Sequence, residues 1–358
     1  MTLTSLHRAP ENPILTPAMV PPSRSDFKVV GVFNPAVARH DGETVLLLRI
    51  AEAPSDVSAD EVAAPVYDNN TGTIEIKRWP RASRGLDLSD PRMIGVDGRE
   101  WLTSISHLRV ARSTDGIHFQ LWPYPAMVSS TPYEASGIED PRITEIDGTY
   151  WVNYTAVSSH GIATALASTR DFRVFERHGI IFPPDNRDVA IFPEKIGGQF
   201  AALHRPMPSG AGLAKPAIWV ARSSDMLSWG NHELVAEARD GHWDDAKIGG
   251  GAVPFRVQVG GRDAWLAIYH GVSSPTTYSL GALVLETWDL TRVIGRSREP
   301  ILRPEAAYER EGFFGGVVFT CGALADGDRV RIYYGAADGV VAVADLSLEE
   351  ILAGLSAS

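Results

Sequence analysis

The sequence predicts an all-β fold, a five-bladed β-propeller, and three observations support this prediction. Apolar residues alternate along five segments, and each segment is interrupted by an Asp-Gly or Gly-Gly pair that suits a tight hairpin turn. A second repeat, a strand followed by a polar turn and an aromatic residue, is interleaved with these hairpins. Helical periodicity is almost absent except in "SLEEILAGL" near the C-terminus. Radial repetition of four-stranded sheets gives a propeller, with one blade for each hairpin.

The repeats extend over nearly the whole chain. The hairpins are "NPAVARHDGETVLLLRI" around 41–42, "EDPRITEIDGTYWVNYT" around 147–148, "DVAIFPEKIGGQFAALHRP" around 197–198, "VPFRVQVGGRDAWLAIYHG" around 260–261 and "GGVVFTCGALADGDRVRIYYGAAD" around 326–327. The second repeat is "VARSTDGIHF" at 110–119, "LASTRDFRVF" at 166–175 and "VARSSDMLSW" at 220–229. Two β-sandwich domains are the alternative, but no Pro- or Ser-rich linker divides the chain. We expect a single catalytic propeller domain over 1–358, with a long insertion loop at about 51–100 that could cover one face.

Composition excludes several classes of protein. The chain has 358 residues, of which 44% are hydrophobic, so it can bury a large core. Its net charge of -11 and the lack of any run of five like charges argue against nucleic acid as a partner. Cys321 is the single cysteine, so we expect a buried, inert thiol and no disulfide or zinc site. No signal peptide or membrane span is recognisable, which predicts a cytoplasmic protein with no membrane contact.

Register arithmetic predicts that polar residues meet at one end of the propeller. Partners in a hairpin are equidistant from the turn, which places Asn34 opposite Arg49, Asp140 opposite Thr155 and Gly315 opposite Asp338. The same arithmetic brings Arg187 near Arg205 and Lys247 toward Tyr269 and His270. These hairpin ends should point at one axial face and form one pocket. Several cations in an acidic protein indicate an anion site, and arginines with a lysine suit phosphate.

Each of these residues also has a structural interpretation. Asp140 precedes Pro141, and Asp-Pro is a common turn start. Arg187 and Arg205 could form a ladder with Asp188 and Glu194, and Lys247 could pair with Asp244 or Asp245 on the surface. The functional interpretation depends on the coincidence of position across five hairpins.

Several stretches together resemble glycoside hydrolase family 130, which contains β-mannoside phosphorylases and β-mannosidases. They include "NPAV" with "LLLR", "SHLRVARSTDG", "GIEDPRIT", "KIGGGAVP", "IYHGV" and "VVFTCGAL" with "IYYGAAD", and they span about residues 30 to 345. The resemblance implies a five-bladed propeller with Asp140 as the single general acid. It implies phosphate ligands at Arg187, Arg205, Lys247, His270 and Tyr269. It also implies mannose contacts at Asn34, Arg49, His107, Glu139 and Asp338.

The expected reaction is inverting phosphorolysis of a β-mannosyl-sugar to α-mannose 1-phosphate and a free sugar. An inverting hydrolase needs a second carboxylate to activate water, whereas phosphate is already a nucleophile and only has to be held in line. Inorganic phosphate is then the co-substrate, and no metal or organic cofactor is implied. The linkage, the acceptor sugar and self-association into a homo-oligomer stay open.

Three other functions compete with this expectation. A β-mannosidase would use Glu139 or Glu194 to activate water, although the family's hydrolytic branches tend to lack the paired arginines seen here. A carbohydrate-binding propeller would have no turnover to lose. A propeller hydrolase acting on furanosides would need three axial carboxylates.

Overall fold

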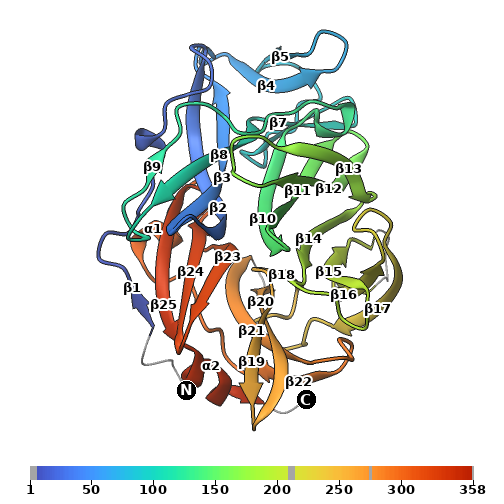
Figure 1. Ribbon diagram of the computed structural model, residues 1–358. Coiled ribbons are helices and arrows are strands. Elements are labelled where there is room, and N and C mark those ends of the chain that lie inside the picture. The colour runs from blue at the N-terminus through green and yellow to red at the C-terminus, as the bar shows by residue number, and fades with distance from the viewer. Residues whose placement is uncertain (1–5, 209–213, 274–275, 357–358) are drawn as a thin grey trace.

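The protein, described by a computed structural model over residues 6–208, 214–273 and 276–356, contains five antiparallel sheets around a common centre and two smaller, two-stranded sheets (Figure 1). The predicted five-bladed β-propeller is confirmed. The first blade contains β2 (Phe27–His40), β3 (Glu43–Pro54), β8 (Ile105–Ser113) and β9 (Gln120–Leu121). The second contains β10 (Ile138–Ile146), β11 (Thr149–Ser158), β12 (Gly161–Thr169) and β13 (Glu176–Phe182). The third contains β14 (Asn186–Ile191), β15 (Phe200–Pro206), β16 (Ile218–Ser223) and β17 (Gly230–Ala236).

The last two blades include strands from both ends of the chain. The fourth blade contains β18 (Lys247–Gly250), β19 (Phe255–Val259), β20 (Arg262–Ser273), β21 (Thr277–Glu286), β22 (Val293–Ser297) and β26 (Leu355–Ser356). The fifth contains β23 (Val318–Asp326), β24 (Arg329–Ala336), β25 (Val340–Ser347) and the early strand β1 (His7–Arg8), which pairs with β25. Arg8 Nε donates to Glu309 Oε1 at 2.8 Å, and the Glu309 carboxylate is fully buried. The N-terminal segment therefore completes the last blade.

Helices are short, as the sequence predicts. They are η1 (Pro17–Met19), η2 (Pro132–Glu134), α1 (Ala307–Arg310) and α2 (Leu348–Ala353). The helix expected from "SLEEILAGL" is α2, and the Ser347 hydroxyl caps it by accepting a hydrogen bond from the Glu350 N–H at 3.2 Å. Within the described residues, no helix has the length and apolar character that a membrane crossing requires.

The insertion at about 51–100 folds into two hairpins, so the expectation of a loop was wrong. They consist of β4 (Glu61–Asp68) with β5 (Thr73–Pro80) and β6 (Met93–Val96) with β7 (Arg99–Leu102). A small apolar cluster around Val62, Ile94 and Trp101 holds the two hairpins together. The second hairpin turns at Asp97-Gly98, both with positive φ, which is the signal that marked the five blade hairpins. Figure 1 shows β4 and β5 extending beyond the ring of blades.

The second repeat forms the turn between the third and fourth strands of a blade. In the first blade, the Ser113 hydroxyl accepts the Gly116 N–H at 2.8 Å. The hydroxyls of Thr169 and Ser223 accept the corresponding N–H groups in the next two blades at 3.0 and 2.9 Å. The hydroxyl replaces a backbone partner in each turn, which explains why Ser or Thr recurs there.

β-Bulges interrupt the inner strands of the first three blades at matching places. Each bulge contains a residue with positive φ: Asn34 (48°), Asp140 (48°) and Asp188 (58°). The extra residue shifts the register, so Arg49 pairs with Phe33, and Thr155 pairs with Glu139. The register arithmetic placed Asn34 opposite Arg49 and Asp140 opposite Thr155, and both predicted pairings were wrong by one residue. Gly315 also does not pair with Asp338, because β23 begins at Val318 and pairs there with Ala336.

Apolar side chains fill the spaces between neighbouring blades. Leu266 and Ile268 of the fourth blade and Ile332 and Tyr334 of the fifth belong to one buried cluster. The inner strands β2, β10, β14 and β23 contact one another around the axis. Packing between the blades thus holds the bulged ends of the inner strands close together.

Candidate active site

A cavity of about 330 Å³ opens where the inner strands converge. All five blades and the insertion contribute to its wall. Most of the residues singled out from the sequence line it, namely Asn34, Arg49, Glu139, Asp140, Arg187, Arg205, Lys247, His270 and Asp338. The predicted convergence of distant hairpin ends on one pocket is therefore confirmed.

Asp140 is held from one side only. Asn34 Nδ2 and Arg49 Nη1 both donate to its Oδ1, at 2.8 and 3.1 Å. Among the described residues, Oδ2 has no hydrogen-bond partner. The positive φ of Asp140 aims its carboxyl group into the cavity from the bulge. A carboxyl with one anchored oxygen and one free oxygen can present a proton in a defined direction.

Arg49 is the common partner of the carboxylates on this side of the cavity. Its Nη2 donates to Glu139 Oε1 at 2.6 Å, and its guanidinium lies 4.5 Å from the centre of the Phe33 ring. Burial raises the pKa of Glu139, and the nearby Asp140 charge adds to that effect. Burial likewise raises the pKa of Asp338 to about 6, against the attraction of Arg49. The low dielectric of the site thus keeps protons on these carboxyl groups to unusually high pH.

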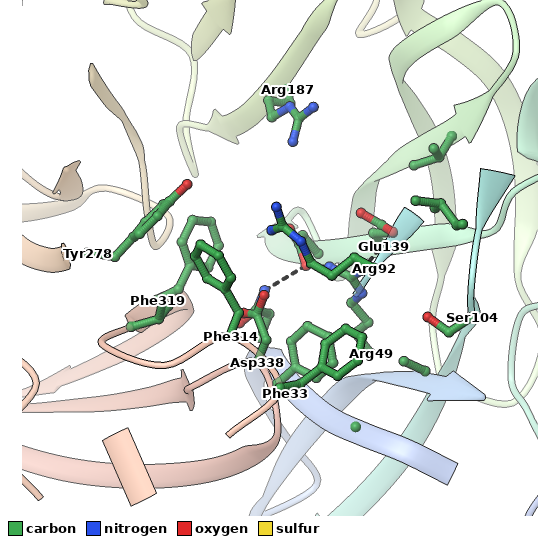
Figure 2. A pocket seen from close by; sticks show the side chains of 18 of the residues that line it. Phe33, Arg49, Arg92, Ser104, Glu139, Arg187, Tyr278, Phe314, Phe319 and Asp338 are labelled. Carbon is green, nitrogen blue, oxygen red and sulfur yellow. Dashed lines mark hydrogen bonds and ion pairs between the residues drawn. The ribbon is translucent and has the colours of Figure 1, made fainter. Parts of the chain in front are cut away.

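The opposite side of the cavity carries cations with few partners. Neither Arg187 nor Lys247 has an ion-pair partner among the described residues. The buried Arg187 Nε lacks a hydrogen-bond acceptor, and Lys247 Nζ lies 5.0 Å from the centre of the Tyr278 ring. Figure 2 shows Arg187 across the open space from Arg49, Glu139 and Asp338. Two unpaired cations facing an open cavity form a site for a small anion.

A buried carboxylate, Asp188, lies between the two remaining predicted phosphate ligands that line the cavity. Arg205 Nε donates to Asp188 Oδ2 at 2.6 Å, and His270 Nε2 lies 3.6 Å from the same oxygen. Burial opposes the charge of Asp188, but Arg205 and Arg142 hold its pKa well below the ordinary value. Burial lowers the pKa of His270 to about 3, so its imidazole is neutral at physiological pH. Asp188 compensates only part of the positive charge around it.

The structure shows which of the ion pairs and turns suggested by the sequence form. Arg205 does pair with Asp188, whereas Glu194 pairs with Arg256 on the surface. Asp244 is bound by Arg239 and Arg296 and leaves Lys247 free to line the cavity. Asp140-Pro141 lies in a β-bulge at the cavity and does not begin a turn. Cys321 is buried, and burial raises the pKa of its thiol, so the thiolate is disfavoured as expected.

Tyr269 and His107 do not line the cavity, which corrects their predicted placement. Successive residues of a strand point to opposite faces, so His270 can face the cavity only if Tyr269 faces away. The Tyr269 hydroxyl donates instead to Asp244 Oδ2 at 2.7 Å, inside the fourth blade. His107 follows Ser106, whose hydroxyl accepts from Arg49, and its own ring lies 3.6 Å from Glu52 on the other face.

The cavity also contains residues that the sequence did not reveal. Asp188 occupies the bulge position of Asn34 and Asp140, so an alignment of the inner strands would have found it. Arg92 comes from the insertion, where no motif marked it, and lies 4.3 Å from the centre of the Phe314 ring. Tyr278, Phe314 and Phe319 form an aromatic wall (Figure 2). Four carboxylates line the described part of the cavity, those of Glu139, Asp140, Asp188 and Asp338.

Comparisons with known proteins identify the family of the chain. A family model described as β-1,4-mannooligosaccharide phosphorylase, of glycoside hydrolase family 130, matches residues 91–356. The chain is 44% identical to a β-1,2-mannobiose phosphorylase from Listeria innocua, over 97% of this chain and 98% of that protein. It is 37% identical to a 1,2-β-oligomannan phosphorylase from Thermoanaerobacter, over 69% of this chain and 80% of that protein. The solved structure of the Listeria innocua enzyme with β-1,2-mannobiose superposes with a TM-score of 0.93, covering 98% of this chain and 99% of that one.

Proposed function

Because the chain belongs to glycoside hydrolase family 130, we propose that it is an inverting β-mannoside phosphorylase whose substrate is β-1,2-mannobiose. The reaction joins inorganic phosphate to the mannosyl carbon, breaks the β-glycosidic bond and yields α-mannose 1-phosphate and mannose. The single observation that carries the proposal is the pair of unpaired cations, Arg187 and Lys247, in the same cavity as Asp140.

The geometry supports a division of the reaction between opposite sides of the cavity. Asp140 protonates the leaving oxygen through its free Oδ2, while Asn34 and Arg49 fix Oδ1. Arg187, Arg205, Lys247 and His270 hold phosphate so that one of its oxygens attacks the mannosyl carbon. The bond to phosphate forms as the bond to the leaving sugar breaks, and the proton from Asp140 goes to that sugar. The cytoplasm suits this reaction, since inorganic phosphate is plentiful there.

The β-1,2 linkage is favoured by the two relatives described above, because both are named for β-1,2-linked substrates and the Listeria innocua enzyme aligns over 97% of this chain. Arg92 and Met93 of the insertion, with Leu102 and Ser104 just after it, line the cavity wall, so this part of the chain shapes the space where the leaving sugar sits.

Hydrolysis is the other candidate, and a single assay separates the two. We expect mannose release from β-1,2-mannobiose to depend on phosphate and to be accompanied by an equal amount of mannose 1-phosphate. Equal release in phosphate-free buffer would reject phosphorolysis. In the reverse direction, mannose 1-phosphate with mannose should give the β-1,2 disaccharide, and formation of only the β-1,4 product would reject the linkage.

A further inference from the structure

Arg142 is buried beside the cavity and does not line it. Its side chain is 1% exposed. Its Nη1 donates to the backbone oxygen of Asp140 at 3.2 Å, within the same bulge. Its Nε and Nη2 donate to the backbone oxygens of Gly251 and Gly250, at 2.7 and 2.9 Å. Arg142 therefore ties the inner strand of the second blade to the start of the fourth.

The same guanidinium also contacts Asp188, the carboxylate that binds Arg205 on the proposed phosphate side of the cavity. Arg142 Nη2 lies 3.4 Å from Asp188 Oδ1, while Asp188 Oδ2 accepts from Arg205 Nε at 2.6 Å. A short chain thus runs from the backbone of Asp140 through Arg142 and Asp188 to Arg205. It connects the general acid to a cation of the phosphate site through the buried side chains of Arg142 and Asp188.

The backbone packs tightly around this chain. A Cβ atom on Gly249 would lie 2.5 Å from Asp188 Oδ2 and 2.7 Å from Arg205 Nε. A Cβ atom on Gly250 would lie 2.6 Å from the backbone oxygen of Asp188. Glycine at both positions lets β18 approach Asp188 closely, so Asp188 has little freedom to move.

We propose that Arg142 is a positioning residue that sets the location of the general acid Asp140 relative to the phosphate cations, through Asp188. This inference rests on the proposed function, since it concerns the same two reacting groups. A planar guanidinium can serve acceptors on several sides, whereas a lysine ammonium is a point charge on a flexible stem. Arg142→Lys keeps the charge but cannot maintain all of these contacts together.

The test compares Arg142→Lys with the wild-type enzyme on two substrates. Misplacement of reacting groups by about 1 Å costs about 100-fold in rate, so we expect kcat on β-1,2-mannobiose to fall about 100-fold. The leaving group of 4-nitrophenyl β-mannoside needs no proton, so the fall in kcat on this substrate should be at least about tenfold smaller. Equal losses on both substrates, or a kcat within about threefold of wild type, would overturn the inference. Arg331→Lys, at a partly buried arginine paired with Asp345 away from the cavity, is the matched control and should keep both rates.

Asp188→Asn provides a second test if Arg142→Lys does not fold. Asp188→Asn keeps the shape of the side chain and removes the charge that holds Arg205 and Arg142. We expect it to raise the KM for phosphate at least about tenfold, with kcat falling more on the disaccharide than on the nitrophenyl substrate. An unchanged phosphate KM or an equal loss on both substrates would contradict the inference. Failure of the proposed function would be seen separately, as phosphate-independent release by the wild-type enzyme.

Discussion

Replacement of Asp338 by Asn should stabilise the protein at neutral pH while impairing catalysis. Burial and the neighbouring Asp140 raise the pKa of Asp338 from 3.8 to about 6. The folded protein therefore keeps the proton to a higher pH than the unfolded chain, so this group reduces stability as pH rises from about 4 to about 6. The difference corresponds to about 3 kcal/mol once the carboxyl is ionised. Asp338 lines the cavity and keeps some contact with solvent, so we expect about 1–2 kcal/mol.

Thermal unfolding of wild type and Asp338→Asn at two pH values measures this effect. At about pH 7.5 the variant should unfold about 1–3 °C higher, whereas at about pH 4.5 the gain should be only about a third as large. Activity should fall at least about tenfold, because Asp338 is a predicted mannose contact. Asp147→Asn, at an exposed hairpin turn whose φ of 52° suits Asn, is the control and should show no pH-dependent gain. A lower midpoint for Asp338→Asn at neutral pH, or an equal gain at both pH values, would refute this reasoning.

Three further variants test other parts of the site. Asp140→Asn should lower kcat about 100- to 10,000-fold with unchanged disaccharide affinity by calorimetry, since Asn tolerates the positive φ; retained turnover would exclude Asp140 as the acid. Arg187→Met should raise the KM for phosphate at least about tenfold with little change in the disaccharide KM; an equal rise in both would contradict a phosphate role. Gly249→Ala should lower the unfolding midpoint by several degrees because its Cβ would overlap Asp188, whereas Gly230→Ala, which has open space and no positive φ, should cost less; the reverse order would refute the packing account.

The fold was predictable because its signals are local. Each blade hairpin is marked by its own turn pair, such as Asp41-Gly42 or Gly260-Gly261, and these turns occur where expected. The insertion carries the same kind of signal at Asp97-Gly98, but its Asp- and Pro-rich surroundings hid the alternation on either side. Packing among Val62, Ile94 and Trp101, which are distant in sequence, makes those strands stable.

The location of the site was predictable, but β-bulges prevented an exact prediction of which side chains face it. Convergence of hairpin ends follows from propeller topology, and it placed Asp140, Arg187 and Lys247 correctly in one cavity. A bulge shifts the register by one residue and reverses which side chains face the axis, and no count from the turn can detect it. Tyr269 shows a second limit: it and His270 are neighbours on one strand, so only one of them can face the cavity, and Tyr269 faces the blade interior. Whether Glu139 and the other lining residues contact mannose stays a prediction.

The pairing of β1 with β25 affects how the protein matures on the ribosome. The fifth blade combines β1, which precedes the other blades in the chain, with β23, β24 and β25, which follow every strand of those blades except β26. The cavity likewise combines Asn34 and Arg49 from early in the chain with Asp338 from near its end. A nascent chain stalled before the fifth blade lacks Asp338 and cannot assemble a complete cavity. Interrupted translation therefore yields inactive fragments, because catalytic competence depends on joining the earliest and latest parts of the polypeptide.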